Sequence, residues 1–305
     1  MLGRGLLRLA LIISFAGIAA ADRVDEPAYT LFLAHYDGTT ANNGRDADLA
    51  SGSTVLAGSG GQIIAAAKFG NGSLDVSGNT LGTQTAYTLA NNFNVDEGTI
   101  EMWIRSDQWG TVQDVNGALF WSTWNGWGGA IFFKETAAGA IEGYWSDFGP
   151  GGGDWYVRSA ALNLDEQWQH IAFEWNLAQQ TTAIYLDGVK LCDQTNLVSN
   201  DYGSGAAPMH PWVGNLGPLF EVGTFQGGYN AFNGEIDEVR VSNLDRYQGQ
   251  AFVPQTQAWQ SAPPPDPFCG DALHPIPDGD LNQDCVVNLV DYTLVGQFWL
   301  VDTNP

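Results

Sequence analysis

The chain has 305 residues, enough for one large and one small domain, and its 44% hydrophobic and 12% aromatic residues are typical of a folded protein. It has 11 lysines and arginines against 34 aspartates and glutamates, a formal net charge of −23. This acidity argues against nucleic acids and anionic membranes as partners and favours divalent cations, although a soluble acidic surface explains many of the carboxylates equally well.

The first 21 residues have the layout of a secretory signal peptide. Arg4 and Arg8 precede an apolar stretch over residues 9–20, and Ala19 and Ala21 occupy the small-residue positions before a cleavage point. An uncleaved amino-terminal anchor is the alternative, but the stretch is short for a bilayer. We expect a secreted or cell-surface protein with no transmembrane segment after cleavage.

Residues 29–241 alternate strand-like runs with clusters of Gly, Asn, Asp and Ser. "GTIEMWIRS" places Ile100, Met102 and Ile104 on one face, the period-two pattern of a half-buried antiparallel strand. "HIAFEWN" and "TTAIYL" repeat the pattern, and Asp187-Gly188 is a dipeptide favoured in tight hairpin turns. These runs predict a two-sheet sandwich.

Five tryptophans lie between residues 107 and 145, and three of them, Trp121, Trp124 and Trp127, flank a short polar turn. Exposed indoles are common anchors in recognition surfaces and stack on sugar rings. We take these three as candidate ligand-binding residues, with the sandwich core as the alternative.

Residues 255–268, "QTQAWQSAPPPDPF", are rich in proline and show no periodic pattern, so they predict a linker. The small module that follows, residues 269–305, has helical spacing but fewer than about 40 residues, a size that usually requires a metal, a disulfide or a neighbour.

The large domain, residues 22–254, resembles the laminin G-like branch of the concanavalin A-like lectin/glucanase superfamily. The resemblance rests on segments in the family's order: "LFLAHYDGTT", "AAAKFGNGSLDVSG", "GTIEMWIRS", "QWQHIAFEWN", "AIYLDGVKL" and "FNGEIDEVRVSNLDRYQGQAFVP". It implies an all-β jelly-roll sandwich, whose members bind carbohydrates, proteins or calcium, or serve as spacers.

The resemblance also implies a calcium ion bridging the first and last strands, with Asp237 near the closing strand and Asp37 approaching it. The apolar positions change parity between Ile236 and Val239, which predicts a bulge there. The alternative is that both aspartates cap turns or pair with arginine.

Hydrolases of the same superfamily carry Glu-x-Asp-x-x-Glu, in which two carboxylates about 5 Å apart perform the reaction. Glu235 and Asp237 begin this pattern, but Arg240 stands in the place of the second acid and does not donate a proton at ordinary pH. The sequence has no His-Glu-x-x-His or Gly-x-Ser-x-Gly motif either, so we expect a protein that is not an enzyme.

The pattern of the small module predicts a calcium loop of the helix-loop-helix type, whose ligands occupy positions 1, 3, 5, 7, 9 and 12, with an Asp/Asn-rich turn that holds no metal as the alternative. Counting from residue 280, these positions hold Asp280, Asn282, Asp284, the carbonyl of Val286, Asn288 and Asp291. With the following "LVGQFWL" the loop resembles one half of a type I dockerin, which implies an EF-hand-like helical module and a cohesin-like partner. Only one repeat is present, so an autonomous calcium module is the alternative.

The chain has three cysteines, and disulfides persist in exported proteins. Cys269 and Cys285 share the small module and are the natural pair, which leaves Cys192 free or buried in the sandwich. Cys285 occupies the sixth loop position, normally a glycine, and a disulfide there would offset the strain of a left-handed turn.

Together these features predict an exported calcium-binding protein whose sandwich binds a carbohydrate or protein, with a dockerin-like module for attachment. The alternatives are a structural or adhesive surface protein whose sandwich is a spacer, and a polysaccharide-degrading enzyme with relocated carboxylates.

Overall fold

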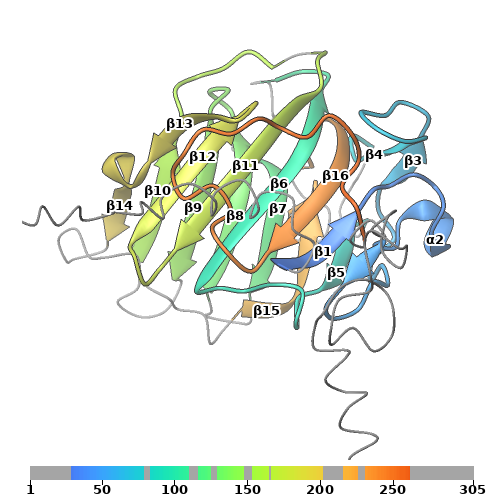
Figure 1. The fold of residues 1–305 in the computed structure, drawn as a ribbon, viewed down its shortest axis with the longest axis horizontal. Coiled ribbons are helices and arrows are strands. Elements are labelled where there is room, and N and C mark those ends of the chain that lie inside the picture. The colour runs from blue at the N-terminus through green and yellow to red at the C-terminus, as the bar shows by residue number, and fades with distance from the viewer. Residues whose placement is uncertain are drawn as a thin grey trace, which may run out of the picture. The chain divides into compact units, whose positions relative to one another are not determined.

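The computed structural model describes residues 29–78, 83–109, 116–124, 129–147, 153–164, 166–201, 216–225 and 231–261 (Figure 1). The chain divides into two units between Ser261 and Ala262, and all of the described residues belong to the first. The expected EF-hand-like helices, calcium loop and Cys269–Cys285 pair lie outside the described residues, as does the expected signal peptide.

In the described parts of the chain the strands form two antiparallel sheets. Sheet A has nine strands, with the order β13-β12-β11-β6-β16-β1-β2 and with β3 and β4 joined to β16 through β4. Sheet B has seven strands, in the order β14-β10-β9-β8-β7-β15-β5.

The strands of sheet A are β1 (Thr30–Ala34), β2 (Leu49–Ala50), β3 (Gln62–Ile64), β4 (Ser73–Asp75), β6 (Glu97–Ser106), β11 (Gln169–Asn176), β12 (Thr181–Leu186), β13 (Val189–Asp193) and β16 (Gly234–Ser242). Those of sheet B are β5 (Ala86–Thr88), β7 (Asn116–Trp124), β8 (Gly129–Thr136), β9 (Ile141–Asp147), β10 (Gly153–Arg158), β14 (Val198–Asp201) and β15 (Leu216–Val222). Two short helical turns, α2 (Ala41–Gly44) and η2 (Gln194–Asn196), complete the described elements.

The core lies between the two sheets and follows the period-two pattern of the sequence. Ile100, Met102 and Ile104 of β6 point into it, and Phe173 of β11 contacts Phe133 of sheet B at 5.6 Å between ring centroids. The prediction of an all-β sandwich is confirmed, and the two antiparallel sheets are consistent with a jelly roll.

The outer face of sheet A differs from the expected half-buried strand, because it is covered as well. Residues 243–261, here called the strap, leave the end of β16 and cross the outer face of β6, β11 and β12, as the orange-red segment of Figure 1 shows. Tyr247 and Phe252 of the strap stack at 3.5 Å between centroids and pack on Tyr185. Gly188 of the β12–β13 turn allows this contact, since a Cβ there would lie 1.9 Å from the Phe252 carbonyl oxygen.

A charged network is buried under the strap and centres on Glu101 of β6, which is 0% exposed. Its carboxylate accepts a 2.7 Å hydrogen bond from Arg240 Nε of β16 and another from the Tyr247 hydroxyl of the strap. His170 Nε2 lies 3.3 Å away, and Arg246 Nε lies 3.8 Å away. The Arg240 guanidinium, together with His170 and Arg246, holds the pKa of Glu101 well below its usual range despite burial.

Trp259, in the segment assigned to the linker from sequence, belongs to the packed sandwich. It is 6% exposed, its backbone N–H donates to Glu238 Oε2 at 2.9 Å, and its ring lies 4.2 Å from the Arg240 guanidinium. In the described part of the chain no helix has the length and apolar character needed to cross a membrane.

We expect Glu101→Gln to lower the free energy of unfolding at pH 7 by about 3–5 kcal/mol, because it leaves a buried arginine without its countercharge. The lowered pKa of Glu101 means that its stabilisation is present above the unfolded-state pKa, about 4.3, and is lost as pH falls toward the folded-state pKa. Urea denaturation should therefore show a difference between variant and wild type that shrinks below about pH 4.

Glu166→Gln is the matched control, since Glu166 is exposed, and its effect should stay within about 0.5 kcal/mol. If the two substitutions lowered the free energy of unfolding equally, the buried network around Glu101 would contribute no more to stability than a surface carboxylate does.

Candidate functional site

The outer face of sheet B carries a pair of tyrosines that were not among the residues predicted from the sequence. Tyr144 of β9 and Tyr156 of β10 are directly opposite in the strand register, and their rings stack at 6.3 Å between centroids with an interplanar angle of 28°. Both are half-buried, whereas their neighbours Trp145 and Trp155 face the core. The alternation in "EGYWSD" and "GDWYVR" indicates that each tyrosine and its neighbouring tryptophan lie on opposite faces of the sheet. It does not indicate which of the two faces is the outer one.

A row of charged side chains lies beside the tyrosines, across β8, β9 and β10. Glu142 is paired in register with Lys134 on one side and with Arg158 on the other, and its carboxylate lies 3.0 Å from Lys134 Nζ and 2.5 Å from Arg158 Nε. Lys134 Nζ lies 5.2 Å from the Tyr144 ring centroid, and the Arg158 guanidinium 4.9 Å from that of Tyr156. The Arg158 side chain is 48% exposed, so one cation of the row reaches solvent beside an aromatic ring.

Of the three tryptophans predicted as ligand-binding residues, the structure describes only the side chain of Trp121. Trp121 lies within β7, is 2% exposed, and packs against Phe225 at 4.7 Å and against Tyr144. Its neighbour Phe120 faces the core, so Trp121 lies on the outer face of sheet B beside Tyr144, where Phe225 covers it. The Trp124 side chain and the whole of Trp127 lie outside the described residues.

Asp237 is fully buried on β16, beside the bulge that the parity change predicted. The register shifts between Asp237 and Arg240, and Glu238 takes the left-handed conformation with φ 53°. Asp237 Oδ2 accepts hydrogen bonds from the backbone N–H groups of Lys68 and Phe69 at 2.8 and 3.1 Å. Burial raises the pKa of Asp237 to about 7, against the effect of those donors.

Asp37 meets the same loop as Asp237. Its Oδ1 accepts a 2.6 Å hydrogen bond from the Asn71 N–H, and Gly70, with φ +64°, lies so close that a Cβ would be 1.9 Å from that oxygen. The structure therefore brings the two predicted aspartates to one loop, residues 68–71. Both also cap its backbone N–H groups, as the alternative interpretation expected.

The buried Asp237 Oδ1 has no hydrogen-bond donor in good geometry among the described residues. An oxygen of this kind fits a calcium ligand, since calcium takes oxygen ligands. No group of three or more acidic, histidine or cysteine side chains in the described residues is arranged for a metal, so a bound ion would need backbone carbonyls or water as well.

The other carboxylates of the hydrolase-like stretch are engaged in structure. Glu235 forms a two-point ion pair with Arg105, at 2.7 and 2.6 Å. Glu238 Oε1 lies 2.8 Å from His35 Nδ1. Burial lowers the pKa of His35, but the hydrogen bond to Glu238 and the negative charge of that carboxylate outweigh it, so the pKa is raised. Cys192, the one described cysteine, is a buried free thiol whose pKa burial raises to about 12.

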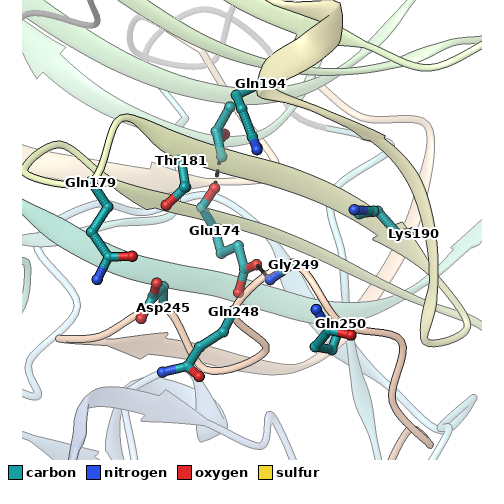
Figure 2. Close-up of a pocket in the computed structure, with 10 residues that line it drawn as sticks. Glu174, Gln179, Thr181, Lys190, Gln194, Asp245, Gln248, Gly249 and Gln250 are labelled. Atoms are coloured by element: carbon teal, nitrogen blue, oxygen red, sulfur yellow. Dashed lines mark hydrogen bonds between the residues drawn. The ribbon is translucent and has the colours of Figure 1, made fainter.

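A polar pocket of about 190 Å³ lies where β11, β12 and β13 meet the strap (Figure 2). No local sequence pattern predicts this pocket, because its walls come from segments far apart in the chain. Its lining residues are Glu174, Gln179, Thr181, Thr182, Lys190, Gln194, Asp245, Gln248, Gly249 and Gln250.

Comparison with known protein families matches residues 78–250, more than half of the chain, to a laminin G-type family model described as the concanavalin A-like lectin/glucanases superfamily. No curated protein matches the chain.

Several solved structures are similar to the chain at low sequence identity. A Ruminococcus gnavus sialidase CBM40 bound to α2,3-sialyllactose has a TM-score of 0.38 and 14% identity, over 53% of this chain and 89% of that one. A Trypanosoma rangeli sialidase has a TM-score of 0.44 and 11% identity, over 73% and 32% of the two chains. The binding domain of botulinum neurotoxin serotype D has a TM-score of 0.48 and 11% identity, over 73% and 50%.

We expect Asp237→Asn to stabilise the metal-free protein at high pH. The folded-state pKa of Asp237 lies above its ordinary value, so stability from this group is present at low pH and is lost between 3.8 and about 7. The free energy of unfolding of the variant relative to wild type should rise by up to about 4 kcal/mol from pH 4 to pH 8.

Urea denaturation in EDTA measures this difference, and Asp96→Asn at an exposed site is the control. A difference that does not change with pH would contradict the raised pKa.

Proposed function

Because the chain belongs to the concanavalin A-like lectin/glucanases superfamily, we propose that it is a carbohydrate-binding protein whose sugar site is the outer face of sheet B. The observation that carries this proposal is the stacked pair Tyr144 and Tyr156, flanked by the half-exposed Arg158.

The chemistry of this surface suits a sugar ring. Aromatic faces contact the apolar C–H face of a pyranose, and a neighbouring guanidinium has several N–H groups for hydroxyl or carboxylate oxygens. The ion pairs of Glu142 with Lys134 and Arg158 hold both cations against the tyrosine rings. The surface is therefore organised before a ligand arrives, which reduces the entropy lost on binding.

The proposal is of binding without hydrolysis. The side chains of the hydrolase-like stretch already have structural partners. Glu235 pairs with Arg105, and Asp237 binds the 68–71 loop. Arg240 pairs with Glu101. A spacer with no ligand is the competing function, and release of reducing ends from polysaccharides tests the enzymatic alternative.

We propose calcium as a ligand of the sandwich at Asp37 and Asp237, supported by the buried Asp237 Oδ1 and the shared loop. A second calcium site in the loop from Asp280 to Asp291, a role in attachment for the small module, and export through residues 1–21 remain proposals supported by the sequence pattern alone.

Tyr156→Ala should weaken binding of a glycan identified on an array by at least about tenfold, which corresponds to about 1.4 kcal/mol. Titration calorimetry measures the loss, and circular dichroism checks the fold. Tyr29→Ala, the same change at an exposed tyrosine ahead of β1 in sheet A, is the control and should bind as wild type does.

If Tyr156→Ala binds the glycan with the affinity of wild type, the sugar site does not lie on the outer face of sheet B. An array on which the wild type binds no glycan, with and without calcium, would favour the spacer.

Calcium chloride should raise the melting temperature of the sandwich, by an amount equivalent to about 2.7 kcal/mol at a hundredfold excess over Kd. Asp237→Asn should lose this rise, because it removes the buried anionic oxygen. Asp280→Asn is the matched control and should keep it, since that residue belongs to the second unit of the chain. A rise that survives in Asp237→Asn but disappears in Asp280→Asn would place the stabilising ion in the small module.

A further inference from the structure

The pocket between sheet A and the strap has a lining suited to a particular chemistry. Four glutamines and two threonines contribute to it, and none of the ten residues has an aromatic or aliphatic side chain. Each glutamine amide offers both donors and acceptors, and so does the Thr181 hydroxyl, whereas the Thr182 hydroxyl already donates to the Glu174 carbonyl at 2.8 Å. A hydrophobic ligand would gain little here, whereas a ligand with several hydroxyl groups finds partners on every side.

The charges of the pocket favour a neutral ligand. Lys190 is paired with Asp193, with 2.9 Å between Nζ and Oδ2. Glu174 and Asp245 are buried, with 3% and 4% of each residue exposed. Their carboxylates repel an anion that enters the pocket. A phosphate or uronic acid is therefore disfavoured.

The Glu174 carboxylate ties the two walls of the pocket together. Glu174 Oε1 accepts from the Tyr185 hydroxyl of β12 at 2.5 Å and from the Gly249 N–H of the strap at 2.7 Å, and Oε2 accepts from the Tyr247 N–H at 3.0 Å. Figure 2 shows Glu174 at the centre, between Thr181 and Gln194 on one side and Asp245, Gln248 and Gly249 on the other. Backbone walls fixed in this way lose little entropy when a ligand binds.

The strap contributes a strained glutamine to the rim. Gln250 N donates to the Tyr247 carbonyl at 2.8 Å, closing a turn whose central residues, Gln248 and Gly249, both have positive φ, 51° and 72°. Turns of this kind favour Asn, Asp or Gly at the first central position, so a glutamine there is strained. Strained positions of this kind cluster at ligand sites.

The volume limits the size of the ligand. Pockets for drug-sized ligands measure about 300–1,000 Å³, and this one, at about 190 Å³, holds a single small ring.

We propose that this pocket binds one neutral, hydroxyl-rich ring, a monosaccharide or a cyclic polyol, through the amides of Gln248, Gln250 and Gln194. The pocket is separate from the tyrosine pair on sheet B, so either site can exist without the other.

The test uses the full chain, labelled with ¹⁵N, and follows the glutamine side-chain amides by NMR during titration with D-glucose, D-galactose, N-acetyl-D-glucosamine and myo-inositol. At least one should shift the Gln248 and Gln250 amides with a Kd of about 1–10 mM, a range typical of a small ligand with few hydrogen bonds. D-Glucuronic acid should bind at least about fivefold more weakly because of the pocket's carboxylates.

Gln248→Gly separates binding from folding. Glycine relieves the positive φ, so the melting temperature should stay equal or rise, while loss of the amide should weaken ring binding by about fivefold. Asn91→Gly, at another exposed position with positive φ (65°), is the control and should leave binding unchanged. Tyr156→Ala should also leave it unchanged, which distinguishes this site from that on sheet B.

The proposal is overturned if none of the four neutral ligands shifts these amides at roughly 50 mM. It is also overturned if Gln248→Gly binds as tightly as wild type, or if the shifts disappear in Tyr156→Ala.

Discussion

The burial of the Glu101 charge in the middle of sheet A is the constraint on which the rest of the sandwich depends. β6 lies between β11 and β16, so a carboxylate on its outer face is far from the sheet edges. Its partners come from Arg240 on the next strand and from Tyr247 on the strap, 139 and 146 residues away in the chain. An unpaired charge at this depth costs several kcal/mol, so the strap must close over it if the sheet is to be stable.

This closure decides where the sandwich can meet a ligand. Tyr247, Phe252 and Trp259 occupy the outer face of sheet A, and a pocket lies where the strap turns at Gln248. The tyrosine pair lies on the other sheet, where the described strap does not reach. The two candidate sites therefore differ in kind: one is an aromatic surface, and the other is a small polar cavity.

The sequence predicted the sandwich and its core because those features depend on local periodicity. Ile100, Met102 and Ile104 could be placed on one face from their spacing, and the bulge at Glu238 from the parity change between Ile236 and Val239. The cover on the other face could not be predicted in this way, because no local pattern shows that Tyr247 will contact Glu101. For the same reason the burial of Trp121 could not be predicted, since it depends on contacts with Phe225 and Tyr144. Asp37 and Asp237 were found through the resemblance, which carries non-local information that periodicity lacks.

The bulge in β16 explains why an acidic stretch that resembles a catalytic motif holds the structure together instead. Retaining glycoside hydrolysis needs two carboxylates about 5 Å apart and directed at one bond. The left-handed Glu238 inserts an extra residue, so Asp237 and Arg240 both face outward while Glu238 turns toward His35 and the Trp259 backbone. Consecutive acidic residues thereby reach different segments: Asp237 holds the loop that also meets Asp37, and Glu238 anchors the strap. Removing the bulge would return Arg240 to the core side, and Glu101 would then lose its countercharge.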